Sequence, residues 1–213
     1  MESDNTKTRF LTAIGHDMRQ PLHALLLYLS ALDRRVKDDD AREILGKAER
    51  AAQSLASMIE ALIQLARLDA DKVEADSERV SLQNLFDDLV AQAPHAKADA
   101  TPLYVKSDPV LLDSIMQHLI SNAARHGGGN AHLSAKEVGG AVEITVRDTG
   151  PGIAPEDQDR IFAEFVRLDG AASSGLGIGL AVARKLATLL GHSIDVRSAP
   201  GEGAAFVIRA QRA

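Results

Sequence analysis

Apolar and small residues recur at alternating steps of four and three through the first third of the chain. This spacing predicts two amphipathic helices, each with a narrow apolar seam of the heptad type. One seam takes positions 11, 15, 18, 22, 25, 29, 32 and 36, and the other takes Ile44, Ala48, Ala51, Leu55, Met58, Leu62 and Leu65. The charged residues 37–40 separate them and predict a short polar loop. A single hairpin would leave much of its apolar stripe in water, so we expect a homodimer in which two hairpins form a four-helix bundle.

The heptad pattern fades after Asp69 into a polar, acidic stretch. We therefore expect two domains, residues 1–77 and 78–213. In the second domain, periodicity predicts a mixed α/β layer, with helices at 82–93, 109–125 and 179–190 and strands at 102–106, 131–138, 141–147, 193–197 and 204–209. Asp108 is expected to cap the helix that begins at Pro109. The chain is thus predicted to belong to the α+β class.

Composition narrows the range of functions. The chain has 213 residues, no cysteine, 3% aromatic residues and a net charge of −6. The lack of cysteine excludes disulfides and thiolate metal sites, and the lack of a dense basic run argues against nucleic acid as a partner. The longest apolar run, residues 24–29, is far shorter than the roughly 20 residues that cross a bilayer, and residues 1–9 do not resemble a signal peptide. We expect a soluble, cytoplasmic core of a longer protein, without membrane contact of its own.

Three clusters in the second half carry candidate chemistry. An Asp-Thr-Gly-Pro-Gly run, residues 148–152, follows a predicted strand; its glycines let main chain approach a ligand, and its aspartate could accept a hydrogen bond from an exocyclic amine. A glycine-rich run, residues 173–180, leads directly into a helix, whose N-terminal N–H groups suit phosphates. Asn122 lies on the preceding helix, with Arg125 and His126 one turn beyond, and its carboxamide could ligate Mg²⁺.

Each cluster has a plainer structural reading. An Asp-x-Gly-x-Gly run is more often a simple turn, and a glycine-rich helix start is often a packing device. The Gly-x-Gly-x-Gly spacing at residues 175–179 also fails the dinucleotide fingerprint and lacks the lysine of a phosphate-binding P-loop. Only the order and separation of all three clusters together is specific.

His16 stands within the first predicted helix, beside Asp17. A lone histidine on a helix is usually a surface residue. At about 100° per residue, however, His16 shares a stripe, offset from the apolar seam, with Gln20, His23 and Leu27. An exposed imidazole beside a carboxylate can act as a nucleophile, because the carboxylate holds one ring nitrogen and leaves the other free.

Taken in order, these motifs resemble those of the sensor histidine kinases of two-component signalling. The likeness covers nearly the whole chain: residues 16–22 resemble the H box, 119–126 the N box, 148–152 the G1 box, 161–165 the F box and 175–180 the G2 box. The resemblance implies a dimerisation and phosphoacceptor hairpin, followed by an ATP-binding α/β sandwich of the Bergerat type that gyrase, Hsp90 and MutL ATPases share.

The resemblance also implies site residues. His16 would be the phosphoacceptor and Asp17 its helper base, while Gln20 would orient water for dephosphorylation. Asn122 would ligate Mg²⁺, and Asp148 would contact adenine. The full set implied for ATP is Asn122, Arg125, His126, Asp148, Gly150, Gly152, Phe165, Arg167, Gly175, Leu176, Gly177 and Gly179.

The sequence departs from the family pattern in four places, the first being Gln20, where many members have Thr or Asn. His118 stands where the N box usually has a first asparagine, and His126 where an aromatic residue is common, so we expect weaker metal and adenine contacts. Only residues 168–174 separate Arg167 from Gly175, which makes the expected ATP lid short.

The favoured function is that of an ATP-dependent protein-histidine kinase, which phosphorylates His16 and passes the group to an aspartate on a response-regulator receiver domain. One alternative is a degenerate kinase that acts mainly as a phosphatase or a regulator-binding scaffold, and His118 motivates it. A nucleotide-driven clamp ATPase is a third reading, but it gives no role to the helix that carries His16 and Asp17.

Overall fold

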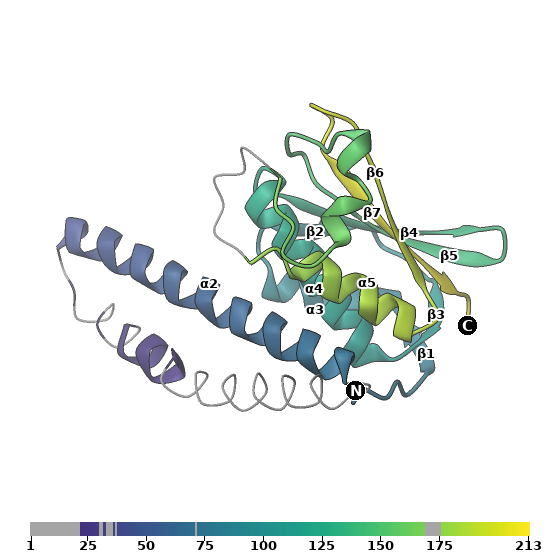
Figure 1. The fold of residues 1–213 in the computed structure, drawn as a ribbon, viewed down its shortest axis with the longest axis horizontal. Coiled ribbons are helices and arrows are strands. Elements are labelled where there is room, and N and C mark those ends of the chain that lie inside the picture. The colour runs from purple at the N-terminus through teal and green to yellow at the C-terminus, as the bar shows by residue number, and fades with distance from the viewer. Residues whose placement is uncertain (1–21, 30–31, 33–35, 37, 71, 169–175) are drawn as a thin grey trace. The chain divides into compact units, whose positions relative to one another are not determined.

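A computed structural model describes residues 22–29, 32, 36, 38–70, 72–168 and 176–213 (Figure 1). The chain divides into two compact units, Met1–Val73 and Glu74–Ala213. This division lies four residues before the domain boundary that the sequence predicts between residues 77 and 78.

The first unit is helical. Residues 22–29 form a helix, and α2 extends over Asp39–Asp69. Asp38 caps α2, because its side chain accepts a hydrogen bond from the N–H of Ala41 at 2.8 Å. Two further acidic residues occupy the first turn, where the helix dipole favours negative charge. The predicted polar loop is therefore too long by two residues: a charge run that looks like an interruption is the start of the helix.

One stripe of α2 closes the core of the helical hairpin. The buried residues of this core are Leu22, Ala52, Ile59 and Ile63, and Leu26, Leu29 and Ala56 pack against them. The seam predicted for α2 begins one position earlier, and parts of it lie in solvent, since Ile44 is 66% and Leu55 is 45% exposed. Helix α2 thus carries two neighbouring apolar stripes. The predicted seam is exposed at Ile44, Ala51 and Leu55, whereas its last residue, Leu65, is buried.

The second unit contains a five-stranded sheet in the order β2-β4-β5-β7-β6. The strands are β2 (Ala96–Ala98), β4 (Ala131–Val138), β5 (Ala141–Arg147), β6 (Ser193–Ser198) and β7 (Ala204–Gln211). β2 pairs parallel with β4, and the other neighbours pair antiparallel. A separate antiparallel pair is formed by β1 (Glu78–Ser81) and β3 (Tyr104–Ser107).

Three helices cover one face of the five-stranded sheet (Figure 1). They are α3 (Leu82–Gln92), α4 (Pro109–His126) and α5 (Gly179–Leu189), and the short 3-10 helices η1 (Pro155–Asp157) and η2 (Arg160–Phe162) precede α5 in the chain. Strand alternation turns Val142, Ile144 and Val146 of β5 toward the helices, and all three are fully buried. The predicted α+β class is therefore confirmed, with a helical hairpin followed by an α/β sandwich.

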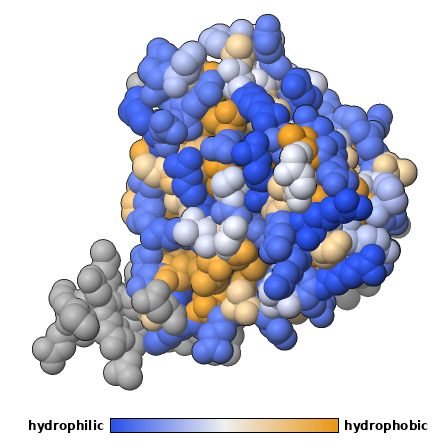
Figure 2. Space-filling view, turned by 90° about the vertical axis from the view of Figure 1, so that its right-hand side faces the viewer, coloured by the Kyte–Doolittle hydropathy of each residue, from blue (hydrophilic) through white to orange (hydrophobic). Residues whose placement is uncertain are grey.

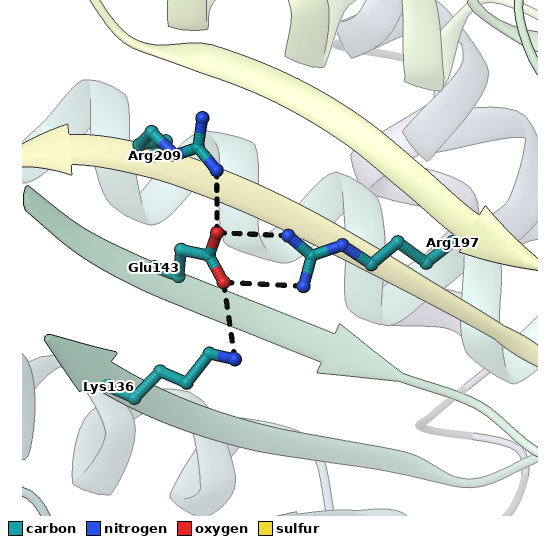
Figure 3. Close-up of polar contacts among 4 residues, drawn as sticks. All are labelled: Lys136, Glu143, Arg197 and Arg209. Atoms are coloured by element: carbon teal, nitrogen blue, oxygen red, sulfur yellow. Dashed lines mark hydrogen bonds and ion pairs between the residues drawn. The ribbon is translucent and has the colours of Figure 1, made fainter. Parts of the chain in front are cut away.

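The opposite face of the sheet is organised around Glu143 of β5, whose carboxylate is only 2% exposed (Figure 3). Arg197 donates to both carboxylate oxygens at 2.9 and 3.3 Å, and Arg209 donates to Oε1 at 2.7 Å. Lys136 Nζ lies 3.4 Å from Oε2. These cations, from three neighbouring strands, hold the pKa of Glu143 down to about 2 and so keep this buried group ionised.

Hydrophilic residues cover most of the surface drawn in Figure 2, and hydrophobic residues gather between them in separate patches. Among the described residues, no helix is both long and apolar enough to span a membrane.

Candidate functional site

Helix α4 begins at the residue that the sequence predicts. Asp108 is its N-cap, and its Oδ1 accepts hydrogen bonds from the N–H groups of Val110 at 2.9 Å and Leu111 at 3.0 Å. Pro109 occupies the first helical position, where its missing N–H costs nothing. This start determines which residues of the last two turns face the core.

The last two turns of α4 carry three of the predicted site residues. Leu119 and Ala123 are buried in the core, and Asn122, next to Ala123, is half-buried. Arg125 and His126 follow in the final turn and are exposed. The carboxamide and the two basic groups therefore lie at the border between core and solvent.

Asp148 follows the end of β5 and is buried, at 5% exposed. Its Oδ1 accepts hydrogen bonds from the N–H groups of Gly150 at 2.9 Å and Ala204 at 3.0 Å. Bonds of this kind compensate the burial of a carboxylate. Among the described residues both bonds end at Oδ1, so Oδ2 is the oxygen through which Asp148 can accept a donor from a ligand.

The backbone around Asp148 leaves no room for side chains. A Cβ on Gly150 would lie 2.5 Å from the carbonyl oxygen of His126, and a Cβ on Gly127 would collide with the Asp148 side chain. Gly203, at φ +74°, would collide with the carbonyl oxygen of Asp148. The end of α4, the turn after β5 and the start of β7 therefore meet at this carboxylate.

Helix α5 begins beside a glycine run. Its N-cap residue, Ile178, makes no side-chain capping bond within the described part of the chain. The first-turn N–H groups of a helix have no partner inside the helix, and they attract anions. Gly177 has φ +68°, and a Cβ there would lie 2.5 Å from the carbonyl oxygen of Val166. The glycines thus bring main chain close together where α5 starts.

His118 lies on α4 next to the start of α5. A Cβ on Gly179 would be 3.6 Å from its Nδ1. Burial, aided by the positive charge of Arg125, lowers the pKa of His118 from 6.5 to about 4. The side chain at this departure from the family pattern is therefore a neutral imidazole at physiological pH.

The pKa of His126 is affected by charges from several segments of the site. Partial desolvation of its ring lowers the pKa of His126, the positive charges of Arg125 and Arg167 lower it further, and the negative charge of Asp148 acts in the opposite direction. Charges from α4, from the turn after β5 and from the segment after η2 therefore act on one imidazole.

The remaining predicted residues fall into two groups. Gly152 has φ +75°, while Phe165 and Leu176 are exposed. His16, Asp17, Gln20 and Gly175 lie outside the described residues.

Two features of the site were not among the residues predicted from the sequence. Gly203 shapes the surroundings of Asp148 from a distant part of the chain, and the Gly-Glu-Gly run before the last strand was the only available signal. Arg184 contacts η2 and Lys185 contacts the segment after it: the Arg184 guanidinium lies 3.9 Å from the centroid of the Phe162 ring, and Lys185 Nζ lies 2.9 Å from Glu164 Oε1. No local motif marks these two residues.

Comparison with protein families finds two matches. Residues 107–213 match the family described as histidine kinase-, DNA gyrase B-, and HSP90-like ATPase, and residues 6–71 match the His Kinase A (phospho-acceptor) domain.

Curated relatives are sensor kinases. The chain is 30% identical to the sensor histidine kinase YcbM of Bacillus subtilis, over 99% of this chain and 73% of the relative. It is 32% identical to the sensor-like histidine kinase SenX3 of Mycolicibacterium smegmatis, over 95% of this chain and 57% of the relative. For the sensor protein GacS of Pseudomonas syringae the identity is 30%, over 98% of this chain and 25% of the relative. The chain thus spans between a quarter and three quarters of these proteins.

Solved structures show the same architecture. Full-length ShkA in complex with AMPPNP superposes with a TM-score of 0.72 at 26% identity, covering 96% of this chain and 46% of that one. The histidine kinase AdeS of Acinetobacter baumannii gives a TM-score of 0.60 at 26% identity, covering 92% and 97%. The chain belongs to the sensor histidine kinases, the ATP-dependent protein-histidine phosphotransferases of two-component signal transduction.

Proposed function

We propose that this chain transfers the γ-phosphoryl group of ATP to His16, and then passes it to an aspartate on the receiver domain of a response regulator. The observation that carries this proposal is that the unit with the buried Asp148 also has a glycine-rich helix start, in the same chain as a segment that matches the phosphoacceptor domain. Since the phosphoryl donor is ATP, we place the reaction in the cytoplasm.

The nucleotide would be held at its two ends. Oδ2 of Asp148 can accept a hydrogen bond from the exocyclic amine of adenine, which distinguishes adenine from guanine. The N–H groups of the first turn of α5 can bind phosphate oxygens, with the glycines at 177 and 179 allowing close approach. Burial of Asp148 and of Ile178 at the start of α5 keeps both ends in fixed positions.

Asn122 fits the requirements of a magnesium ligand. Mg²⁺ prefers oxygen donors and usually keeps several water or phosphate ligands, so a single carboxamide oxygen suffices. Among the described residues there is no group of three or more His, Asp or Glu side chains that could hold a metal ion. Magnesium would therefore be bound jointly by Asn122 and the nucleotide, where it would neutralise phosphate charge.

The phosphoryl group would move in two steps. In the first, a ring nitrogen of His16 attacks the γ-phosphorus, a P–N bond forms and the P–O bond to ADP breaks. Asp17 would accept a hydrogen bond from the other ring nitrogen, which keeps the attacking nitrogen unprotonated. In the second step a carboxylate oxygen of the regulator attacks the same phosphorus, and the P–N bond breaks.

We also propose that the hairpin forms a homodimer. The exposed stripe of α2 includes Ile44 and Leu55, and the exposed Leu25 and Leu32 lie seven residues apart on the other helix. Two copies packed by these stripes would bury apolar surface that one hairpin leaves in water. On the same helix Leu27 is 71% exposed, and its sequence spacing puts it on the His16 stripe, so we assign it to regulator docking.

A phosphatase activity in addition to the kinase activity would depend on Gln20, one turn beyond His16. Its carboxamide would align a water molecule on the phospho-aspartate of the regulator, whereas it offers no base for autophosphorylation. We therefore place a phosphatase activity beside the kinase activity and expect Gln20→Ala to reduce it selectively.

The kinase proposal is tested by incubating the chain with ATP labelled at the γ-phosphate. We expect label that is stable in base and labile in acid, as a phosphohistidine is. His16→Ala should abolish the label and leave ATP binding within a few-fold, while the control His23→Ala, on the same stripe, should keep it. Label that persisted in His16→Ala would disprove the assignment of the acceptor.

A further inference from the structure

Helix η2 and the residues that follow it lead to Arg167, one of the predicted site residues. We call residues 160–167 the bridging segment. Phe162 anchors it in the core, being almost fully buried and packed edge-on against Phe206 with ring centroids 6.2 Å apart. Beyond Phe162 the segment is half-buried or exposed, so its path depends on contacts other than core packing.

Two successive residues of α5 contact the bridging segment. The guanidinium of Arg184 lies 3.9 Å from the centroid of the Phe162 ring, a cation–π distance. Lys185 Nζ lies 2.9 Å from Glu164 Oε1, with the two side chains 39% and 36% exposed. An ion pair that is partly withdrawn from solvent is screened less than one on the open surface. Arg184 and Lys185 thus attach the bridging segment to α5 at two points.

The backbone adds a third attachment. The N–H of Phe165 donates to the carbonyl oxygen of Gly177 at 3.0 Å. Phe165 has φ +62°, which is unfavourable for an aromatic residue and persists only where the surroundings impose it. The three attachments together impose a particular path on the two residues that lead to Arg167.

The position of Arg167 is consistent with a role at the phosphates. Its positive charge acts on His126, at the end of α4, in addition to the effects of burial and of Arg125 on the pKa of His126. Arg167 directly follows Val166, whose carbonyl oxygen packs against Gly177 two residues before α5 begins, so Arg167 lies close to the start of α5. A guanidinium in this place can bind phosphate oxygens through two parallel hydrogen bonds.

We propose that Arg184 and Lys185 are positioning residues for the nucleotide. By holding Phe162 and Glu164 on α5, they place Arg167 where it binds the phosphates of a nucleotide whose other contacts come from the start of α5. This inference rests on the proposed function, because it requires that the site bind ATP.

A charge-reversal cycle on Lys185 and Glu164 tests the inference. We expect Lys185→Glu and Glu164→Lys each to weaken ATP binding about threefold to tenfold, as suits the loss of a partly exposed ion pair. The double variant should restore affinity to within about twofold of wild type, because the pair is remade with opposite polarity. Affinity for adenosine, which has no phosphate, should be the same in all four proteins. Binding is measured by competition with a fluorescent ATP analogue.

Arg160→Glu is the matched control, since it reverses a charge on the same segment and breaks a pair, with Asp157 at 2.6 Å, that does not reach α5. It should leave ATP affinity unchanged. Thermal unfolding is recorded for every variant, and Lys185→Met replaces any reversal that fails to fold. The inference would be overturned by any of three results. ATP affinity could be equal in all proteins, the double variant could fail to recover its ATP affinity, or adenosine affinity could fall together with ATP affinity. If the wild-type chain bound no ATP, the proposed function would fail first, and the inference with it.

Discussion

At the scale of single residues, the site depends on side chains whose burial is compensated by a few specific partners. Asp148 is buried next to a turn, yet two backbone N–H groups satisfy one of its oxygens. That division lets the same carboxylate hold the turn together and still accept a ligand. The two roles can be separated by a substitution that preserves one oxygen.

Asp148→Asn should weaken ATP binding more than tenfold while leaving the fold intact. The asparagine oxygen can still accept from Gly150 and Ala204, but its amide nitrogen would present a donor to the donor on adenine. The control is Asp195→Asn, an exposed position on β6 that should bind ATP normally. Titration of ATP, together with thermal unfolding, measures both effects. Normal ATP affinity in Asp148→Asn would place the adenine contact elsewhere.

His118 should make the protein sensitive to acid. Its pKa is lowered from 6.5 to about 4 by burial and by Arg125, so the folded state favours the neutral form. The resulting stability is fully present above about pH 6.5 and is lost as the pH falls through about 4, by up to about 3 kcal/mol. His118→Asn should flatten this dependence when the free energy of unfolding is measured between pH 7 and pH 4. If the free energy of unfolding of His118→Asn depended on pH as steeply as that of wild type, protonation of His118 would not destabilise the folded state.

At the scale of elements, local signals predicted more than distant pairings did. The start of α4 followed from the Asp108 cap and Pro109, and the β4–β5 hairpin from alternation around two glycines, because both depend on neighbours in sequence. β1 and β2 were missed, since they have four and three residues and pair with strands remote in the sequence.

In the candidate site, too, local motifs could be predicted from the sequence and contacts between distant segments could not. Its residue types and their order could be read from motifs, because Asn122, Asp148 and the glycine run each stand beside a recognisable helix or strand. The contact of Gly203 with Asp148 and the attachment of Glu164 to Lys185 join segments that are far apart in sequence. Only the folded chain places such residues together, so no periodicity could reveal them.

The sheet supplies a prediction that is independent of the nucleotide site. Glu143→Gln should destabilise the fold by about 1–3 kcal/mol, because Arg197, Arg209 and Lys136 would lose a buried charged acceptor. The control Glu137→Gln breaks a 2.7 Å pair with Arg212 on the surface and should change stability by less than about 0.5 kcal/mol. Denaturant unfolding at neutral pH compares the two, and equal effects would show that burial of Glu143 carries no special weight.

At the scale of the whole molecule, an acceptor hairpin and a nucleotide-binding sandwich share one chain. The sandwich has a core of its own, in which α4 packs on β4 and β5 and α5 packs on β6. The hairpin core is smaller, and α2 keeps a second apolar stripe outside it. We propose a second copy of the chain as the partner for this stripe, since a two-fold axis would place identical stripes face to face.

Leu55→Glu tests this assembly. Leu55 is 45% exposed in the single chain, so a glutamate should be tolerated in the hairpin itself. In a symmetric dimer, however, the substitution would bring two carboxylates into an apolar seam, where burial of unpaired charge is strongly unfavourable. We therefore expect association to weaken at least tenfold, as measured by sedimentation across a micromolar concentration series.

Gln53→Glu adds the same charge at an exposed position about half a turn away from this stripe and should leave association unchanged. If both variants dimerised like wild type, the stripe through Ile44 and Leu55 would not be the dimer interface. If both dissociated equally, net charge rather than the seam would control assembly.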